Sequence, residues 1–384
     1  MSVSIVKCND YNEQTVKTAL TEVLAPLGGL DWVKSGMTIA IKANLITFMN
    51  PETAATTHPS LLCALIHMLR ERGAEVIVGD SPGGLYNHAY VNRVYAATGM
   101  KQAEEAGARL NQDFSQREAQ FADAEVLHDF TYTAWLDSAD AIIDFCKLKT
   151  HGMMCMSSAV KNMFGTIPGT MKPEYHYRFP KHEDFANMLV DLNEYFKPRI
   201  SIVDAVVGME GNGPTAGKPR HIGALAASEN PHELDLLCAK LIGLTAAQVP
   251  TLQAAVSRNL IPANVTELTV HGDWQAFCMS DFELVKQTQS LVFYSDNRSA
   301  LGRWGGAVMQ RMMASVPKLH AAECVGCGEC ARVCPANAIE MVDRRPKINR
   351  EKCIRCFCCQ EFCPKGAMKV HRPFIANLLE HISK

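Results

Sequence analysis

The chain has 384 residues, of which 47% are hydrophobic and 20% are charged. This length exceeds one ordinary hydrophobic core and predicts two or more domains. A formal net charge of -2 gives no basis for nucleic-acid binding across the surface, and no apolar run approaches the roughly 18 residues of a membrane span. The first ten residues lack the pattern of a secretory signal. We therefore expect a cytoplasmic protein with no membrane span and no nucleic-acid partner.

Short β-rich runs alternate with helical patterns through the first 300 residues. Strands are predicted at 2–7, 37–43, 75–78, 139–145, 200–206 and 222–226, and helices at 13–25, 60–72, 88–106, 184–196 and 232–242. Runs such as 38–41 are mostly apolar, as expected when both faces of a strand are covered. The alternation predicts an α/β domain at 1–300 with a doubly wound, mostly parallel sheet.

Polar residues gather where these predicted strands end, which is where ligands bind in such sheets. Lysines there could converge on an anion, with hydroxyl and helix N-terminal donors nearby. Each segment by itself is also explained as a solvated loop or a cap, but their co-occurrence at four strand ends favours a site. We predict that a carboxylate or phosphate ligand binds to Lys42, Asn44, Thr56, Thr57, Asp80, Ser81, Lys147, Lys161, Asn162, Glu210 and Asn212.

Three residues are the predicted catalytic groups: His58, His151 and Lys149. Histidine titrates near neutrality and suits acid/base work, although a loop histidine that caps a backbone group is the competing interpretation. Carboxylates such as Asp204 could orient the histidines or hold a divalent ion.

Two further segments bear on the pocket. Residues 166–183 are aperiodic and carry several aromatic side chains, so we predict a lid over the pocket. The glycine-rich run at 211–219 departs from a phosphate-binding P-loop, because Asn212 and Pro219 stand where that motif needs glycine and Ser or Thr. No flavin or molybdenum motif is visible, so an additional cofactor stays open.

Nine of the 15 cysteines lie between Cys324 and Cys363. Eight of them form two runs of Cys-x-x-Cys-x-x-Cys-x-x-x-Cys-Pro, and the second run repeats the first 29 residues further along. In this pattern three thiolates surround one cluster and the fourth ligates the other cluster. A pair of zinc sites is the alternative, although zinc ribbons use separated pairs of cysteines. The sequence therefore predicts two [4Fe–4S] clusters, on Cys324, Cys327, Cys330 and Cys363 and on Cys353, Cys356, Cys359 and Cys334.

Residues from about 320 to 371 resemble a bacterial two-cluster ferredoxin, which implies a small α+β domain at 319–371. Between residues 321 and 370, nine basic residues outnumber six acidic ones, whereas free ferredoxins of this type tend to be acidic. We expect the module to dock on an acidic surface or on its own N-terminal domain.

Six segments together resemble the family called domain of unknown function 362. They are Lys42-Ala43-Asn44, Thr56-Thr57-His58-Pro59, Gly79-Asp80-Ser81, Lys147-x-Lys149-Thr150-His151, Lys161-Asn162-x-x-Gly165 and Gly211-Asn212-Gly213-Pro214. The resemblance covers roughly residues 3–300, and members of that family often carry such a ferredoxin module. It implies little about activity.

Residues 301–318 are expected to form a helical linker packed between the domains, with a membrane-surface helix as the alternative. Residues 372–384 are expected to form a C-terminal helix. Taken together, the sequence predicts an iron–sulfur oxidoreductase that exchanges electrons with an anionic small molecule and with a redox partner protein. One alternative is an electron carrier whose α/β domain is a docking or ligand-binding platform. Another is a non-redox enzyme that keeps its clusters for stability.

Overall fold

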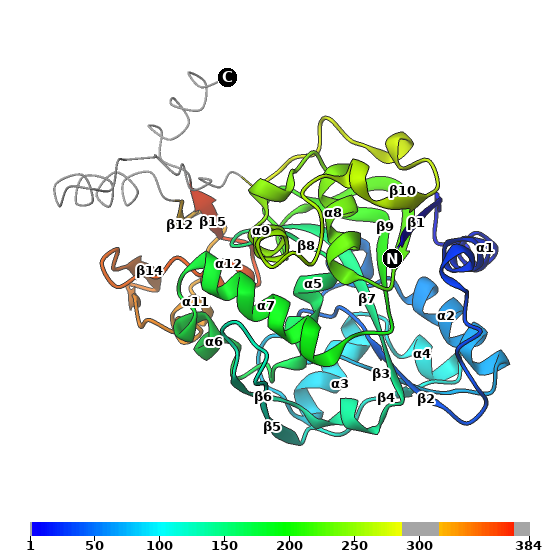
Figure 1. Ribbon diagram of the computed structural model, residues 1–384. Helices are drawn as coiled ribbons and strands as arrows, with labels where there is room; N and C mark the ends of the chain where they lie inside the picture. The colour runs from blue at the N-terminus through cyan, green and yellow to red at the C-terminus, as the bar shows by residue number, and fades with distance from the viewer. Residues whose placement is uncertain (1, 286–314, 372–384) are drawn as a thin grey trace.

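The computed structural model describes residues 2–285 and 315–371 (Figure 1). A nine-stranded sheet forms the centre of the larger described domain, in the order β11-β1-β10-β9-β7-β2-β3-β4 with β8 paired to β7. Its strands are β1 (Ser2–Lys7), β2 (Thr38–Lys42), β3 (Glu75–Gly79), β4 (Arg109–Leu110), β7 (Ala141–His151), β8 (Cys155–Ser157), β9 (Ile200–Glu210), β10 (Lys218–Ser228) and β11 (Thr269–His271). The pairs β1-β10, β10-β9 and β7-β8 are antiparallel and the other five are parallel. The predicted α/β fold with a mostly parallel sheet is confirmed.

Helices cover both faces of this sheet (Figure 1). One face carries α1 (Glu13–Leu24), α2 (Pro59–Glu71), α3 (His88–Ala97) and α4 (Gln102–Glu105). The other face carries α5 (Ala159–Asn162), α7 (His182–Phe196), α8 (Pro231–Leu241) and α9 (Pro250–Ser257). Because strand side chains alternate between faces, Ile39 and Ile41 join the first core, while Val203 and Ala205 join the second.

Several elements differ from the sequence prediction, among them β9 and β10, which are longer than the predicted strands 200–206 and 222–226. The helix expected at 88–106 is split into α3 and α4, because Gly99 between them adopts a left-handed conformation with φ 73°. The aperiodic segment 166–183 contains a helix, α6 (Lys172–Arg178). Strand β7 runs on to His151, six residues past its predicted end, because β8 and β9 both pair with its last residues.

The smaller domain consists of short elements around the cysteines. Strand β12 (Val316–Leu319) pairs with β15 (Met368–His371), and β13 (Ile339–Val342) pairs with β14 (Arg345–Ile348). The third cysteine of each run lies in a one-turn helix: Cys330 in α11 (Glu329–Arg332) and Cys359 in α12 (Cys358–Glu361). The end of the predicted linker helix is thus a strand instead, and residues 301–314 and 372–384 lie outside the described residues.

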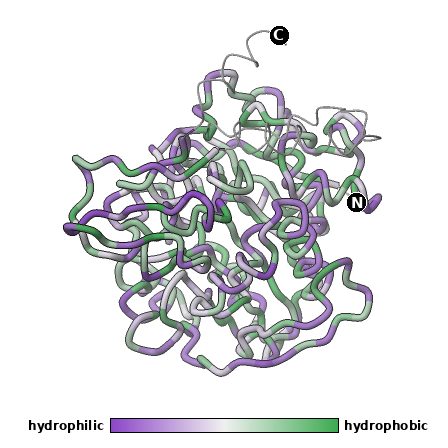
Figure 2. The backbone as a smooth tube through the Cα atoms, turned by 90° about the vertical axis from the view of Figure 1, so that its left-hand side faces the viewer, coloured by the Kyte–Doolittle hydropathy of each residue, from purple (hydrophilic) through white to green (hydrophobic). Residues whose placement is uncertain are grey.

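A separate hairpin, β5 (Gln116–Gln120) with β6 (Asp129–Thr133), extends the larger domain. In Figure 2, hydrophobic and hydrophilic residues alternate along the outer segments, as they do in amphipathic elements. Within the described ranges, none of the helices combines the length and the apolar character needed to cross a membrane.

A buried ion pair joins the carboxyl ends of β2 and β3. The Lys42 ammonium lies 2.8 Å from Asp80 Oδ1, and both side chains are almost fully buried. Gly165, just after α5, lies against this pair: a Cβ atom there would overlap both Asp80 Oδ1 and the end of the Lys42 side chain. Glycine is therefore required at position 165 because the neighbouring side chains leave no room for a Cβ atom. Its backbone conformation does not require glycine, since its φ is not in the left-handed region.

We predict that Gly165→Ala lowers the free energy of unfolding by about 2–3 kcal/mol, because the added methyl group must displace a buried ion pair. Urea denaturation followed by circular dichroism measures this loss. Gly36→Ala is the control, since its Cβ would meet open space and only its φ of 88° opposes the substitution, at a cost of about 1 kcal/mol. Equal losses in the two variants would contradict the prediction.

Candidate functional site

A polar cavity of about 450 Å³ lies at the carboxyl edge of the sheet, where β2, β3 and β7 end. Three lysines line it: Lys149 from β7, Lys161 from α5 and Lys172 from α6. Of the other predicted ligand-binding residues, Asn44, Asp80 and Asn162 also line it. One lining residue, Glu361, comes from the ferredoxin module.

Asn162 organises the floor of this cavity. Its Oδ1 accepts hydrogen bonds from Lys42 Nζ (3.1 Å) and Asn44 Nδ2 (2.8 Å). Its own Nδ2 donates to Asp144 Oδ1 at 2.6 Å. Burial raises the pKa of Asp144 to about 7, and the nearby Lys42 ammonium opposes that rise. A hydrogen-bond network centred on Asn162 therefore fixes the position of Asn44 in the lining of the cavity.

The three lining lysines differ from Lys42 in having no carboxylate partner. Lys149 donates hydrogen bonds to Asn44 Oδ1 and the Ala55 carbonyl, and burial lowers its pKa well below the ordinary value. Burial also lowers the pKa of Lys161, and that of Lys172 to about 8. Within the described residues none of the three forms an ion pair within 4.0 Å, although the Glu361 carboxylate lines the same cavity and acts on Lys161.

Glu361 enters the cavity next to His151. The Nδ1 atom of His151 accepts hydrogen bonds from the backbone N–H groups of Met153 (3.0 Å) and Met154 (3.1 Å), so the proton of the neutral ring belongs on Nε2. That nitrogen lies 3.7 Å from Glu361 Oε2. Burial lowers the pKa of His151 to about 4. Burial disfavours the Glu361 charge, but the Lys161 ammonium and His151 hold the pKa of this carboxyl below its usual range.

Two predicted site residues lie in a different cluster. Lys147 Nζ is 2.6 Å from Asp204 Oδ2 and donates to the Tyr11 hydroxyl at 2.9 Å. The His58 ring stacks on Tyr11 with centroids 3.5 Å apart. The pairing of β7 with β9 is irregular between Lys147 and Lys149, which separates the surroundings of the two lysines. Neither Lys147 nor His58 is among the residues that line the cavity.

The remaining predicted ligand-binding residues support loops. The Thr57 hydroxyl donates to the Phe145 carbonyl at 2.7 Å, and Thr56 is fully buried beside it. Ser81 Oγ accepts from the Gly169 N–H at 2.7 Å, and Glu210 Oε2 accepts from the Glu283 N–H at 3.1 Å. None of these four lines the cavity.

Sequence reasoning missed several lining residues: Ser157, Phe164, Lys172, Pro214 and Glu361. Lys172 stood in the expected lid, where its charge was a usable signal. Glu361 lies within the second cysteine run, and its role depends on how the ferredoxin module docks, which no local pattern indicates.

The ferredoxin module docks on the α/β domain through its second half (Figure 1). Gln360 is fully buried, and its Nε2 donates to Asn212 Oδ1 (2.9 Å) and the Gly213 carbonyl (2.8 Å). Phe357 joins the hydrophobic core around α7. Docking on its own N-terminal domain was one sequence expectation, but the contacts are amide and aromatic groups, not the module's basic residues.

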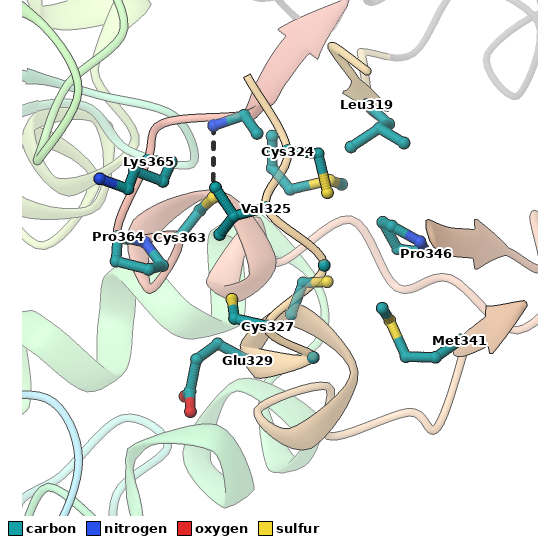
Figure 3. Close-up of a pocket in the computed structure, with 15 residues that line it drawn as sticks. Leu319, Cys324, Val325, Cys327, Glu329, Met341, Pro346, Cys363, Pro364 and Lys365 are labelled. Carbon is teal, nitrogen blue, oxygen red and sulfur yellow. Dashed lines mark hydrogen bonds between the residues drawn. The ribbon is translucent and has the colours of Figure 1, made fainter. Parts of the chain in front are cut away.

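Three cysteines of the first run and the last cysteine of the second run surround another cavity, of about 350 Å³ (Figure 3). Cys324, Cys327, Cys330 and Cys363 all line it. The Cys363 sulfur accepts a hydrogen bond from the Ala367 N–H at 3.2 Å, and the Cys334 sulfur accepts one from Ala338 at the same distance. Four thiols around a cavity, with backbone N–H groups directed at sulfur, suit an iron–sulfur cluster.

Comparison with known proteins agrees with both parts of this description. Residues 39–240 match the family described as Domain of unknown function (DUF362), and residues 317–364 match a 4Fe-4S dicluster domain. The chain is 32% identical over 276 residues to a thylakoid-associated protein of Synechocystis sp., covering 70% of this chain and 82% of that protein.

Two solved structures were also compared. A Thermotoga maritima structural-genomics protein has 12% identity and a TM-score of 0.37, covering 56% of each chain. The lactate racemase apoprotein of Thermoanaerobacterium thermosaccharolyticum has 12% identity and a TM-score of 0.40, covering 64% of this chain and 57% of its own. This chain thus spans little more than half the length of either. From the family match and the sequence identity to the cyanobacterial protein, the chain belongs to the DUF362 family, and its C-terminal 4Fe-4S dicluster region is of the kind that supports iron–sulfur electron transfer.

Proposed function

We propose that this protein is an iron–sulfur oxidoreductase whose α/β domain binds an anionic small molecule in the polar cavity. The observation that carries the proposal is the trio of Lys149, Lys161 and Lys172 around one cavity, without ion pairs among the described residues. The neighbouring lysines Lys42 and Lys147 are both paired with aspartates. Buried charges are normally paired, so an unpaired trio supports a ligand that brings the missing negative charge.

The ferredoxin module supplies the redox part of this function. Two thiolate sets would hold the clusters, which when bound provide one-electron transfer: Cys324, Cys327, Cys330 and Cys363, and Cys353, Cys356, Cys359 and Cys334. Electrons that the anion gains or loses are balanced by a redox partner protein, and protons by the solvent. A cytoplasmic location belongs to the same proposal, because reducing compartments keep such thiols available.

The residues around the cavity have different roles in this proposed function. Lys161 and Lys172 hold the anion as ammonium groups. Lys149, whose pKa is lowered by burial, is the group best suited to accept a proton from the ligand. His151 is oriented by its two backbone donors and directs Nε2–H at Glu361, so it positions that carboxylate. Phe164 and α6 border the cavity and exclude water.

The alternative is an electron carrier in which the α/β domain binds a ligand without transforming it. The exposed side of the ferredoxin module supports contact with a partner in either case. Cys327 is exposed there, and Val325 beside it is 52% exposed. Arg344 and Lys347 on the same half are exposed and form no ion pair within the described chain, so an acidic electron-transfer protein fits this side.

We predict that Lys161→Met weakens the binding of butyrate and of succinate by tenfold or more, because a buried charge-assisted contact is lost (about 1.5–3 kcal/mol). Anaerobic calorimetry on the full chain measures the affinity, with the exposed Lys34→Met as control. EPR on the reduced protein then tests whether an anion that binds also reoxidises it. If the clusters reduce and reoxidise normally but no anion binds or accepts electrons, the carrier alternative replaces the proposal.

We predict that butyrate affinity falls as the pH rises through about 8. Burial lowers the pKa of Lys172 to about 8, so its ammonium charge is present below that pH and lost above it, while butyrate keeps its charge throughout. Calorimetric titrations between pH 6.5 and 9.5 measure the profile. In Lys172→Met the step near pH 8 should disappear, and an unchanged profile in that variant would assign the step to another group.

We predict that Arg344→Glu with Lys347→Glu weakens binding of an acidic ferredoxin about tenfold at low ionic strength, and that the difference narrows as salt is added. Surface plasmon resonance at several salt concentrations measures both effects. The exposed pair Lys34→Glu with Lys240→Glu on the α/β domain is the matched double charge reversal and should change little. Equal weakening by both variants would show a general charge effect, with no docking face on the module.

A further inference from the structure

The side chain of Glu361 is held in the cavity by contacts on either side of it. The residue before it, Gln360, is fixed to Asn212 and Gly213. The backbone carbonyl of Glu361 accepts a hydrogen bond from Thr215 Oγ1 at 3.0 Å. The residue after it, Phe362, has its ring directly against Gly83, where a Cβ atom would overlap the ring. The contacts between the two domains therefore fix the position of the Glu361 carboxylate, which is not a freely moving surface group.

Glu361 contributes the only carboxylate that lines the cavity without being paired to a lysine, as far as the described residues show. The other lining carboxylate, Asp80, is neutralised by Lys42 at 2.8 Å. Lys161 is the strongest opposite charge acting on Glu361, yet no ion pair within 4.0 Å joins them. The ammonium groups and this carboxylate thus line the same cavity.

We propose that Glu361 makes the cavity selective for monoanions, so that the ferredoxin module itself determines which substrates the α/β domain accepts. This inference rests on the anion site proposed above and adds the charge class of its ligand. One negative group is held by Lys161 and Lys172. A second negative group on the same small molecule would lie close to the Glu361 carboxylate in a partly desolvated space, where like charges repel strongly.

The geometry also ties selectivity to docking. Glu361 reaches the cavity only when α12 is seated on the α/β domain, so the complete site needs both domains. A small monocarboxylate satisfies the lysines and leaves the Glu361 carboxylate next to His151 Nε2, at 3.7 Å. A dicarboxylate or a phosphate dianion must displace the carboxylate or leave one charge unmatched.

Butyrate and succinate provide a test, because they share a four-carbon chain and differ by one carboxylate. Anaerobic calorimetry on the full chain with its clusters assembled compares wild type, Glu361→Gln and Glu361→Asp. We expect wild type and Glu361→Asp to bind butyrate at least as tightly as succinate. In Glu361→Gln the ratio of succinate to butyrate affinity should rise about tenfold, because the repelling charge is gone while the shape is kept. The exposed Glu351→Gln on the same module is the control and should leave the ratio unchanged.

The outcomes separate the two proposals. If wild type binds butyrate or succinate and Glu361→Gln leaves their ratio unchanged, the anion site stands and the role of Glu361 is overturned. If neither anion binds any variant while the cluster EPR signals are normal, the anion site itself fails, and this inference fails with it. A wild-type-like ratio in Glu361→Asp together with the shift in Glu361→Gln assigns the effect to charge and not to a disturbed interface.

Discussion

The cost of burying lysine ammonium groups away from water governs how the carboxyl edge of the sheet is built. Five lysines reach this edge, and burial of an ammonium group is costly unless a partner or ligand compensates it. Lys42 and Lys147 are compensated within the protein by Asp80 and Asp204. Both pairs join neighbouring strands, β2 with β3 and β7 with β9, so each also fixes strand ends relative to one another.

The other three lysines, Lys149, Lys161 and Lys172, have no such pair among the described residues, and their lowered pKa values record the cost. A chain selected only for stability would replace or pair such groups. Their presence around one cavity is a cost in folding free energy that a bound anion reduces. The two paired lysines hold strand ends together, whereas the other three line the cavity. Which lysines are paired follows from the positions of Asp80 and Asp204.

Much of the fold could be predicted from the sequence, because strand and helix periodicities are local. Strand β1 and helix α7 lie where their patterns indicate, whereas the end of β7 depends on pairing with β8 and β9. The same limit applies to the site. Lys147 and Lys149 are two residues apart and look equivalent in sequence, but Asp204 lies opposite Lys147 and the register of β9 then shifts. His58 was expected with His151 and instead stacks on Tyr11, a contact between residues 47 positions apart that no local pattern encodes.

The internal repeat of the ferredoxin module shows which positions of its second half contact the α/β domain. Moving 29 residues along the chain takes Gly328, Ala331 and Arg332 of the first half to Phe357, Gln360 and Glu361 of the second. The four cysteines of one run match those of the other, but these three positions differ, and in the second half they carry the aromatic, amide and carboxylate contacts to the α/β domain.

The backbone at the first of these positions supports the same conclusion. Gly328 and Phe357 both precede their helix in the left-handed conformation, with φ of 82° and 59°. Glycine adopts it freely, whereas phenylalanine pays roughly 1–2 kcal/mol. The strained residue is retained where its ring is buried in the core around α7. At this position the first half therefore keeps an unstrained glycine, whereas the second half keeps a strained residue whose ring packs on the α/β domain.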